Sequence, residues 1–424
     1  MVSVATIPQI NIFEYDDIEK QGDLERFKLA LEGIDDEALM QKLEAKRDKG
    51  RNDYPIRVMW NLFIAMRVFE HIKVESFRRE LARNSQLRRA CGLHDGEPRR
   101  HLVPPSGVFS RFLASLMEEQ EEIDRIFDTQ VSQLYELVSG FGGDLAGDGK
   151  YIDSVANGKP KEGQSATDNR SENDAQWSKK EYHWTDSNGK KQTRTECHFG
   201  FKTHILCDVH TELPIGYTVT AANADERAEM LKILDSAVIS NEYRRAVARH
   251  LMLDRGYDSG PLIKTVKDAG IIPVVDIRNA WKDGETTKQY KDTNIVYDYK
   301  GAVYYVDDKC DLVKMKYEGY DKQKKCLRYS HDGKTYKIYI SYDERVFLPI
   351  ARDSDKFARL YKGRTSVERL NARIDRDYML EDHCIRGLKK TRLMVSLSLV
   401  IMNGMAIGKM KNGKTGIRSL KTAA

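Results

Sequence analysis

The chain lacks the cysteine patterns that hold zinc sites or disulfide frameworks. Its six cysteines are scattered over 424 residues, and no two of them form a CxxC pair. This spacing excludes a small disulfide-bonded secreted domain and a cysteine-rich metal site, and it is typical of a reducing compartment.

The sequence also lacks a signal peptide and a long apolar run. Its amino terminus has neither the positively charged start nor the apolar core of a secretory signal. The most apolar stretch, Leu393–Ile407, is short and contains Ser396, Ser398 and Asn403. This composition predicts a buried helix rather than a membrane span. We therefore expect a cytoplasmic protein without a membrane partner.

No charge of one sign dominates the composition. The chain has 70 Lys and Arg against 65 Asp and Glu, a net charge of +5, and its 40% hydrophobic residues exclude a disordered chain. The mild basic excess is compatible with nucleic-acid binding without indicating it. The length predicts two or three structural units.

Residues 1–140 are predicted to be helical and to bind DNA. Apolar residues recur at helical spacing, and the segment 74–93 adds a dense basic face that includes Arg78, Arg79 and Arg83. Short helices with such a face resemble a helix-turn-helix module. A plain helical bundle with solvated arginines explains the same pattern, and the sequence leaves this alternative open.

From residue 141 onward the pattern changes to α/β. Strand and helix signals alternate through 141–280, which predicts a mixed sheet with flanking helices. Within it, residues 156–191 have almost no apolar periodicity and are expected to form a long exposed loop. Tyrosine and β-branched residues predict a β-rich insertion over 281–350. Core helices are expected over 351–410, and 411–424 form a basic tail.

Three acids occupy positions that suit a catalytic site. Asp148 lies on the first predicted strand, Asp254 follows the apolar run HLML, and Glu368 lies on a late helix. Working groups of open α/β sheets gather at the carboxyl ends of strands. Three carboxylates without neighbouring histidine or cysteine ligands suit Mg²⁺ or Mn²⁺, and two such ions about 4 Å apart can promote attack on a phosphate. Each acid alone fits a turn, a cap or a surface charge.

The segment 361–376 is predicted to be one amphipathic helix. Its apolar stripe consists of Val367, Leu370 and Ile374, and the face of Glu368 also carries Tyr361, Arg364, Asn371 and Asp375. Arg364, one turn before Glu368, can hold a phosphate or simply pair with that acid.

Other candidates are weaker when taken singly. Asp153 competes with Asp148, but an odd spacing along a strand places the two side chains on opposite faces. Lys202 and His204 could approach the site, although lone residues of this kind are more often surface or core groups. Asp225 is expected to cap a helix.

Several motifs together resemble a known family. They are LAGDGKYI, HFGFKTHILCD with LPIGYTVTAANADE, LMLDRGYDS, and YKGRTSVERLNARI. The chain resembles a bacterial insertion-sequence transposase of the DDE type with a ribonuclease H-like core, and its amino-terminal part is similar to the DNA-binding region of these elements.

The resemblance implies a definite activity. Asp148, Asp254 and Glu368 would hold two divalent metal ions, Mg²⁺ or Mn²⁺. The enzyme would cut the terminal inverted repeats of an element and join them to target DNA, as a homodimer on double-stranded DNA. Tyr361 and Arg364 would hold the terminal phosphates. Two alternatives remain: a ribonuclease H-like nuclease or resolvase that cuts without joining, and a non-catalytic DNA-binding protein derived from a transposase.

One position departs from the family pattern. Related enzymes have a lysine seven residues after the glutamate, where this chain has Asp375. Arg376 lies about 100° further around a helix and is therefore not an obvious substitute. One expected phosphate contact, and hairpin formation during excision, are thus open.

Overall fold

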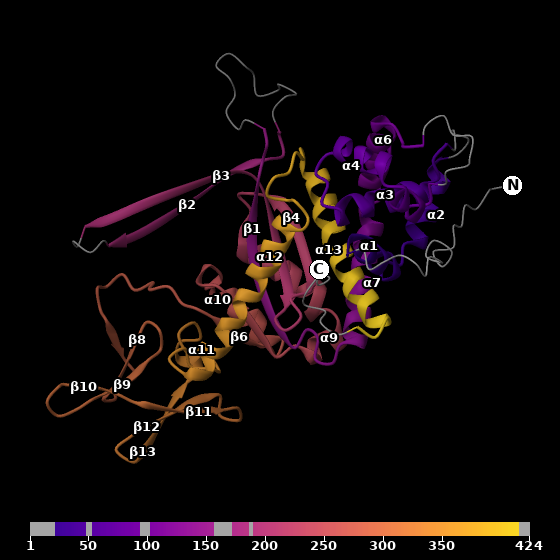
Figure 1. Ribbon diagram of the computed structural model, residues 1–424. Coiled ribbons are helices and arrows are strands. Elements are labelled where there is room, and N and C mark those ends of the chain that lie inside the picture. The colour runs from indigo at the N-terminus through magenta and orange to yellow at the C-terminus, as the bar shows by residue number, and fades with distance from the viewer. Residues whose placement is uncertain (1–21, 48–52, 94–101, 157–171, 186–189, 415–424) are drawn as a thin grey trace.

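The computed structural model describes residues 22–47, 53–93, 102–156, 172–185 and 190–414. Helices precede the first strand of this described chain (Figure 1). They are α1 (Gly22–Glu32), α2 (Glu37–Arg47), α3 (Ile56–Val68), α4 (Val74–Arg83), α5 (Ser85–Ala90), α6 (Ser106–Glu118) and α7 (Gln120–Leu137).

The centre of the molecule is a mixed sheet, which confirms the predicted α/β class. Its strands are β1 (Asp144–Asp153), β2 (Gln176–Thr185), β3 (Lys191–Asp208), β4 (Pro214–Ala221), β5 (His250–Leu253) and β6 (Ile272–Val275). They lie in the order β2-β3-β1-β5-β6, and β4 also pairs with β3. Strands β1, β5 and β6 are parallel, whereas β3 is antiparallel to β1.

Strand β3 is long enough to take different partners along its length. Its first half pairs with β2 and its second half with β4. The β2–β3 half extends beyond the sheet as a two-stranded ribbon (Figure 1). The loop prediction for 156–191 is therefore wrong over β2, while 157–171 and 186–189 lie outside the described residues. Residues 176–181 are mostly exposed, so this part of the ribbon lacks the apolar alternation that identifies a half-buried strand.

Helices cover both faces of the sheet. Their bounds are α8 (Glu226–Leu234), a π-helical turn (Asp235–Ile239), α9 (Glu242–Val247), α10 (Gly260–Asp268), α11 (Asp355–Tyr361) and α12 (Thr365–Arg376). Helix α8 packs on one face of β1, the face to which position 147 points, because a Cβ on Gly147 would meet Met230 of α8. Helix α12 packs on the opposite face, where Ser366 contacts Cys207 of β3. Asp225 caps α8 by accepting the Arg227 and Ala228 N–H groups, as expected.

Short strands fill the chain between β6 and α11. They are β7 (Thr287–Gln289), β8 (Ile295–Asp298), β9 (Val303–Val306), β10 (Leu312–Lys314), β11 (Lys316–Asp321), β12 (Cys326–His331) and β13 (Lys334–Tyr339). They form a four-stranded and a three-stranded sheet around a separate apolar core, which includes Val303, Tyr329 and Ile338. This β-rich segment projects from the central sheet beside β6 and α11 (Figure 1).

Helix α13 (Leu388–Lys411) joins the amino-terminal helices to the sheet. It is long and apolar enough to cross a membrane, but 94% of its most apolar window is buried inside the protein. It packs against α1, α7 and β4, as expected for a core helix. Two glycines allow α1 to approach closely, because a Cβ on Gly408 would lie 2.3 Å from the Leu29 carbonyl oxygen and one on Gly404 2.9 Å from that of Ala30.

Candidate active site

Strands β1 and β5 bring Asp148 and Asp254 side by side. The two strands are adjacent and parallel, and Ala146 lies opposite Met252. Two residues further along, the same register leads to Asp148 and Asp254, so both side chains point to the face covered by α12. Their proximity also shows in the electrostatics, because the charge of Asp254 contributes to a raised pKa of Asp148.

The carboxyl group of Asp148 is destabilised in its ionised form. Burial raises its pKa to about 7, with further contributions from the charges of Asp254 and Glu226. The Gly149 N–H and the Arg364 guanidinium lower the pKa of Asp148, but by less. A carboxylate held under these conditions gains from a nearby cation, and such perturbed groups concentrate at functional sites.

Asp254 is fixed by a tight turn that directly follows β5. Its Oδ1 accepts a hydrogen bond of 2.7 Å from the Gly256 N–H, and one turn of 3-10 helix, Arg255–Tyr257, follows. A Cβ at position 256 would lie only 2.7 Å from that Oδ1, so a larger residue there would displace the Asp254 carboxylate. Behind the turn the Tyr257 ring is fully buried. The motif DRGYDS therefore sets the direction of the Asp254 carboxylate.

Glu368 approaches from the helix above this face. Its side chain is 48% exposed and accepts a 2.6 Å hydrogen bond from Nη1 of Arg364. Arg364 also interacts electrostatically with Asp148, so the arginine links the helix acid to the strand acid. Its Nε is buried without a hydrogen-bond partner in the part of the chain that the structure describes.

The single helix predicted over 361–376 is interrupted. Helix α11 ends at Tyr361, a 3-10 turn covers Lys362–Arg364, and α12 begins at Thr365. The predicted apolar stripe of α12 is confirmed by Val367, Leu370 and Ile374, which are all buried. The ring of Tyr361 stacks on Phe357 of α11 and lies 5.8 Å from the Arg364 guanidinium carbon.

A second contact joins β1 to α12. Nζ of Lys150 lies 2.6 Å from Oδ2 of Asp375, and both side chains are largely buried. Lys150 follows Asp148 by two residues and therefore lies on the same face of the strand. The position that departs from the family pattern is thus occupied by an acid that binds a lysine from the strand of Asp148.

The chemistry of the acids suits a hard divalent cation. Asp148 and Asp254 offer only carboxylate oxygens, the ligands that Mg²⁺ and Mn²⁺ prefer. The pKa of Asp148 is raised first by burial and then by the charges of Asp254 and Glu226. Within the described ranges, no three His, Cys, Asp or Glu side chains are close enough together to hold one ion. Glu368 is bound to Arg364 in this arrangement. Asp148 and Asp254 thus fit a metal ion, and Glu368 would join them only after releasing Arg364.

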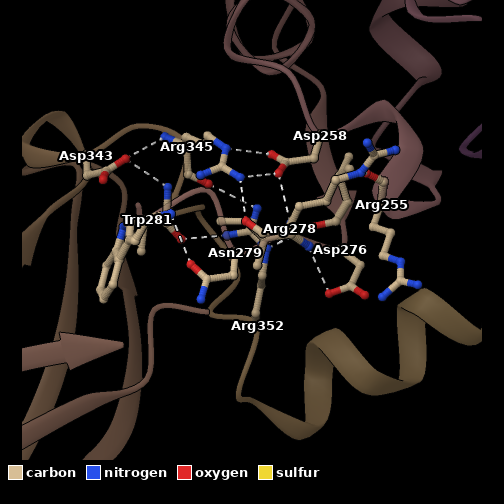
Figure 2. A network of polar contacts seen from close by, with 12 residues as sticks. Arg255, Asp258, Asp276, Arg278, Asn279, Trp281, Asp343, Arg345 and Arg352 are labelled. Atoms are coloured by element: carbon tan, nitrogen blue, oxygen red, sulfur yellow. Dashed lines mark hydrogen bonds and ion pairs between the residues drawn. The ribbon is translucent and has the colours of Figure 1, made fainter. Parts of the chain in front are cut away.

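A buried ion pair ties this site to the β-rich segment (Figure 2). Both oxygens of Asp258, four residues after Asp254, bind the Arg345 guanidinium, one of them at 3.1 Å from Nε. The Arg278 N–H donates to Asp258 at 3.0 Å, and its carbonyl accepts from Arg345 at 2.6 Å. Arg278 precedes the β-rich segment and Arg345 follows it, so the cluster holds both ends of the segment next to the candidate site.

The secondary candidates lie apart from the three acids. Lys202 is buried and its Nζ lies 2.8 Å from Glu226, on the α8 side of the sheet. His204 is also buried and bonds to Thr220, and burial lowers its pKa to about 4. Asp153 is 64% exposed and pairs with His198.

The predicted basic helix is α4, and its arginines differ in their surroundings. Arg78 binds Glu75 and the Pro104 carbonyl, and Arg83 binds Glu80. Arg79 is exposed. Arg88 is buried and donates to the carbonyl groups of Leu81 and Ala82, so it serves as a structural cap. The basic surface of α4 is therefore partly neutralised by glutamates of the same helix.

Glu226 was missed by reasoning from the sequence. It begins α8, pairs with Lys202, and contributes to the raised pKa of Asp148. A Cβ on Gly149, next to Asp148, would lie 3.5 Å from the Glu226 carboxyl carbon. No local motif marks this residue, because its approach depends on how α8 packs against β1.

Comparisons with known proteins identify the family. A family model described as "Transposase DDE domain" matches residues 160–403, more than half of the chain, including Asp254 and Glu368 but not β1. No curated protein matches the chain. Among solved structures, a cryo-EM structure of the piggyBac transposase synaptic complex with hairpin DNA is similar, with a TM-score of 0.40 and 12% identity over 94% of this chain and 77% of that chain. The extent of the family match shows that this protein belongs to the family of the transposase DDE domain.

Proposed function

We propose that the protein cuts the ends of a mobile DNA element and joins them to target DNA by two-metal phosphoryl transfer. The observation that carries this proposal is the pair of Asp148 and Asp254 on adjacent parallel strands, under the helix of Glu368, in a chain of a transposase family. The proposal includes a bacterial insertion-sequence origin and a ribonuclease H-like core. The sheet order and the parallel β1, β5 and β6 support that core.

The three acids divide the work of the site. Asp148 and Asp254 would hold divalent cations, and Glu368 would complete the set if it released Arg364. The chemistry that such ions would supply is activation of a water or a 3′-hydroxyl and neutralisation of charge on the leaving oxygen. Burial raises the pKa of Asp148 to about 7, and a divalent cation held there would favour its carboxylate form. Catalysis then rests on positioning and charge neutralisation, because phosphoryl transfer asks little covalent chemistry of the protein.

Arg364 and Tyr361 are proposed to hold the phosphates at the cut end. The Arg364 guanidinium donates to Glu368 and interacts electrostatically with Asp148, and its buried Nε has no partner within the described ranges. An arginine fork with spare donors suits a phosphate. The partly buried Tyr361 ring lies 5.8 Å from the guanidinium carbon of Arg364 and contacts the same region.

DNA binding is proposed to involve α4 and a dimer. Arg78, Arg79 and Arg83 would contact phosphates, which makes affinity fall steeply with salt concentration. Two copies would hold two ends of the element in the cytoplasm. The composition of the helix and the exposure of Arg79 support this role.

A joining assay separates this proposal from a nuclease. A labelled duplex that ends at the cut site is incubated with a supercoiled plasmid and Mg²⁺. A transposase covalently transfers the label to the plasmid, whereas a nuclease or resolvase of similar fold leaves it unjoined. Absence of joined product, with cutting of the uncut duplex intact, would replace the proposal with the nuclease.

A non-catalytic DNA-binding protein is excluded by a different result. Asp254→Asn should bind the duplex as the wild type does and should lose both cutting and joining. If the wild type binds the duplex but neither cuts nor joins it with Mg²⁺ or Mn²⁺, this alternative is correct.

A further inference from the structure

Lys150 and Asp375 form a polar bridge beside the three acids. Their side-chain atoms lie 2.6 Å apart, and Lys150 is 24% exposed while Asp375 is 17% exposed. Along β1, two residues separate the Cα atoms of Asp148 and Lys150 by about 7 Å. On α12, Asp375 follows Glu368 by two turns and lies on the same face of the helix. The bridge therefore joins the elements that carry Asp148 and Glu368, on the face of the sheet to which Asp148 and Asp254 point.

A DNA phosphate next to these acids needs cations. Arg364 already binds Glu368, and Lys202 is buried on the other face with Glu226. Lys150 lies on the face of Asp148, and a quarter of its side chain reaches solvent. An ammonium group has three N–H donors, and Asp375 uses one of them. Lys150 therefore retains donors for an anionic ligand.

The acceptors around Lys150 are incompletely satisfied. Oδ1 of Asp375 and Oδ1 of Asn371, one turn earlier on α12, are buried and have no hydrogen-bond partner among the described residues. A buried acceptor left without a partner costs about 1–3 kcal/mol. Neither oxygen receives a hydrogen bond from Lys150, so the two N–H groups of its ammonium that Asp375 Oδ2 does not bind are not committed to these neighbours.

We propose that Lys150 binds a phosphate oxygen of the DNA strand next to the cut site, and that Asp375 holds its ammonium group in place. Lys150 is a binding residue in this account, and Asp375 is a positioning residue. The inference rests on the proposed function and deepens it by naming a strand-borne cation for the substrate backbone. The competing explanation is a purely structural bridge between β1 and α12.

The test measures how DNA affinity depends on salt. A short duplex from the DNA that flanks the reading frame is titrated in EDTA with the wild type, Lys150→Met, Lys150→Arg, Asp375→Asn and the exchange variant K150D/D375K. Affinity falls with rising salt, so a plot of log affinity against log salt concentration has a negative slope. Loss of one phosphate contact should make this slope less steep by about 0.9. Affinity should fall about tenfold in Lys150→Met and be largely kept in Lys150→Arg.

The exchange variant and a matched control make the test specific. K150D/D375K keeps the ion pair and returns a cation to the site, so its salt slope should return to the wild-type value. Lys267→Met removes a lysine of similar exposure, 19%, that pairs with Glu344 away from the acids, and it should leave the slope unchanged. Thermal unfolding of each variant shows whether the chain is folded.

The outcomes are distinguishable. This inference alone would be overturned if folded Lys150→Met had the salt slope of the wild type. It would also be overturned if the exchange variant had the reduced slope of Lys150→Met. Either result would show that the bridge is purely structural. A wild type that binds the duplex but neither cuts nor joins it with Mg²⁺ or Mn²⁺ would overturn the proposed function itself.

Discussion

Replacing Asp148 by asparagine should stabilise the folded protein at high pH while it abolishes DNA cutting. The substitution keeps the shape of the side chain and removes its charge. The pKa of this carboxyl rises from 3.8 in the unfolded chain to about 7 in the folded chain, because of burial and the neighbouring Asp254 and Glu226. Between these pH values the folded state binds more protons than the unfolded state. The free energy of unfolding of the wild type therefore falls from about pH 4 to about pH 7 and then levels off.

The size of the effect follows from the two pKa values. A difference of about 3 (7 − 3.8), at about 1.4 kcal/mol for each pKa unit, gives a ceiling of about 4 kcal/mol. The Asp148 side chain is only partly buried, so solvent screening reduces this cost. We expect Asp148→Asn to gain about 2 kcal/mol over the wild type at pH 8 and little below pH 4.

Urea unfolding in EDTA measures this difference. The two proteins are compared at pH 4 and pH 8, and Asp268→Asn, which changes an exposed acid of α10, serves as the control with no expected pH-dependent gain. Added Mg²⁺ should then stabilise the wild type and not Asp148→Asn, because only the wild type gains a bound ion in the folded state. If Asp148→Asn is no more stable than the wild type at pH 8, the account of a destabilised carboxylate is incorrect.

Three further predictions concern the surroundings of the site. Arg345→Met should lower the free energy of unfolding by about 3 kcal/mol in chemical denaturation, because Asp258 remains buried without its ion-pair partner. A decrease of less than about 1 kcal/mol would contradict the claim that this ion pair stabilises the fold. Gly408→Ala should lower the free energy of unfolding by about 1–3 kcal/mol in the same assay, because the new Cβ meets the Leu29 carbonyl. Replacing a helix glycine by alanine usually raises this free energy by about 1 kcal/mol, and such a rise here would show that α1 and α13 are further apart. Tyr257→Phe should leave the free energy of unfolding unchanged or raise it by about 1 kcal/mol, because the buried Tyr257 hydroxyl has no hydrogen-bond partner among the described residues. A clearly lower melting temperature would show that the hydroxyl does have a partner.

Local patterns predicted the parts of the site that depend on one element. Strand parity separated Asp148 from Asp153, and the structure places the first partly buried beside Asp254 and the second mostly exposed. The turn in DRGYDS and the cap formed by Asp225 also follow from short-range chemistry. Each of these features is decided by residues close together in the sequence, so the sequence alone is informative there.

Features that depend on packing between distant elements were not predictable. The sequence marks Asp375 as a departure from the family but gives no sign that Lys150 binds it, because 225 positions (375 − 150) separate the two residues. Strand β2 lacks apolar alternation, and only its pairing with β3 identifies it as a strand. The sequence allows Arg364 either to hold a phosphate or to pair with Glu368, and the folded structure shows the pair.

Cutting of element ends by wild type and variants tests the central claim most directly. A duplex containing the terminal repeat is incubated with Mg²⁺ or Mn²⁺, and nicks are mapped on a sequencing gel. The account predicts nicking at the element end that requires the metal and that disappears in Asp148→Asn, Asp254→Asn and Glu368→Gln. Asp153 is the exposed acid that competes with Asp148 in the sequence, so Asp153→Asn serves as the control and should cut as the wild type does. Nicking that survives in all three variants, or that does not need a divalent cation, would contradict the account.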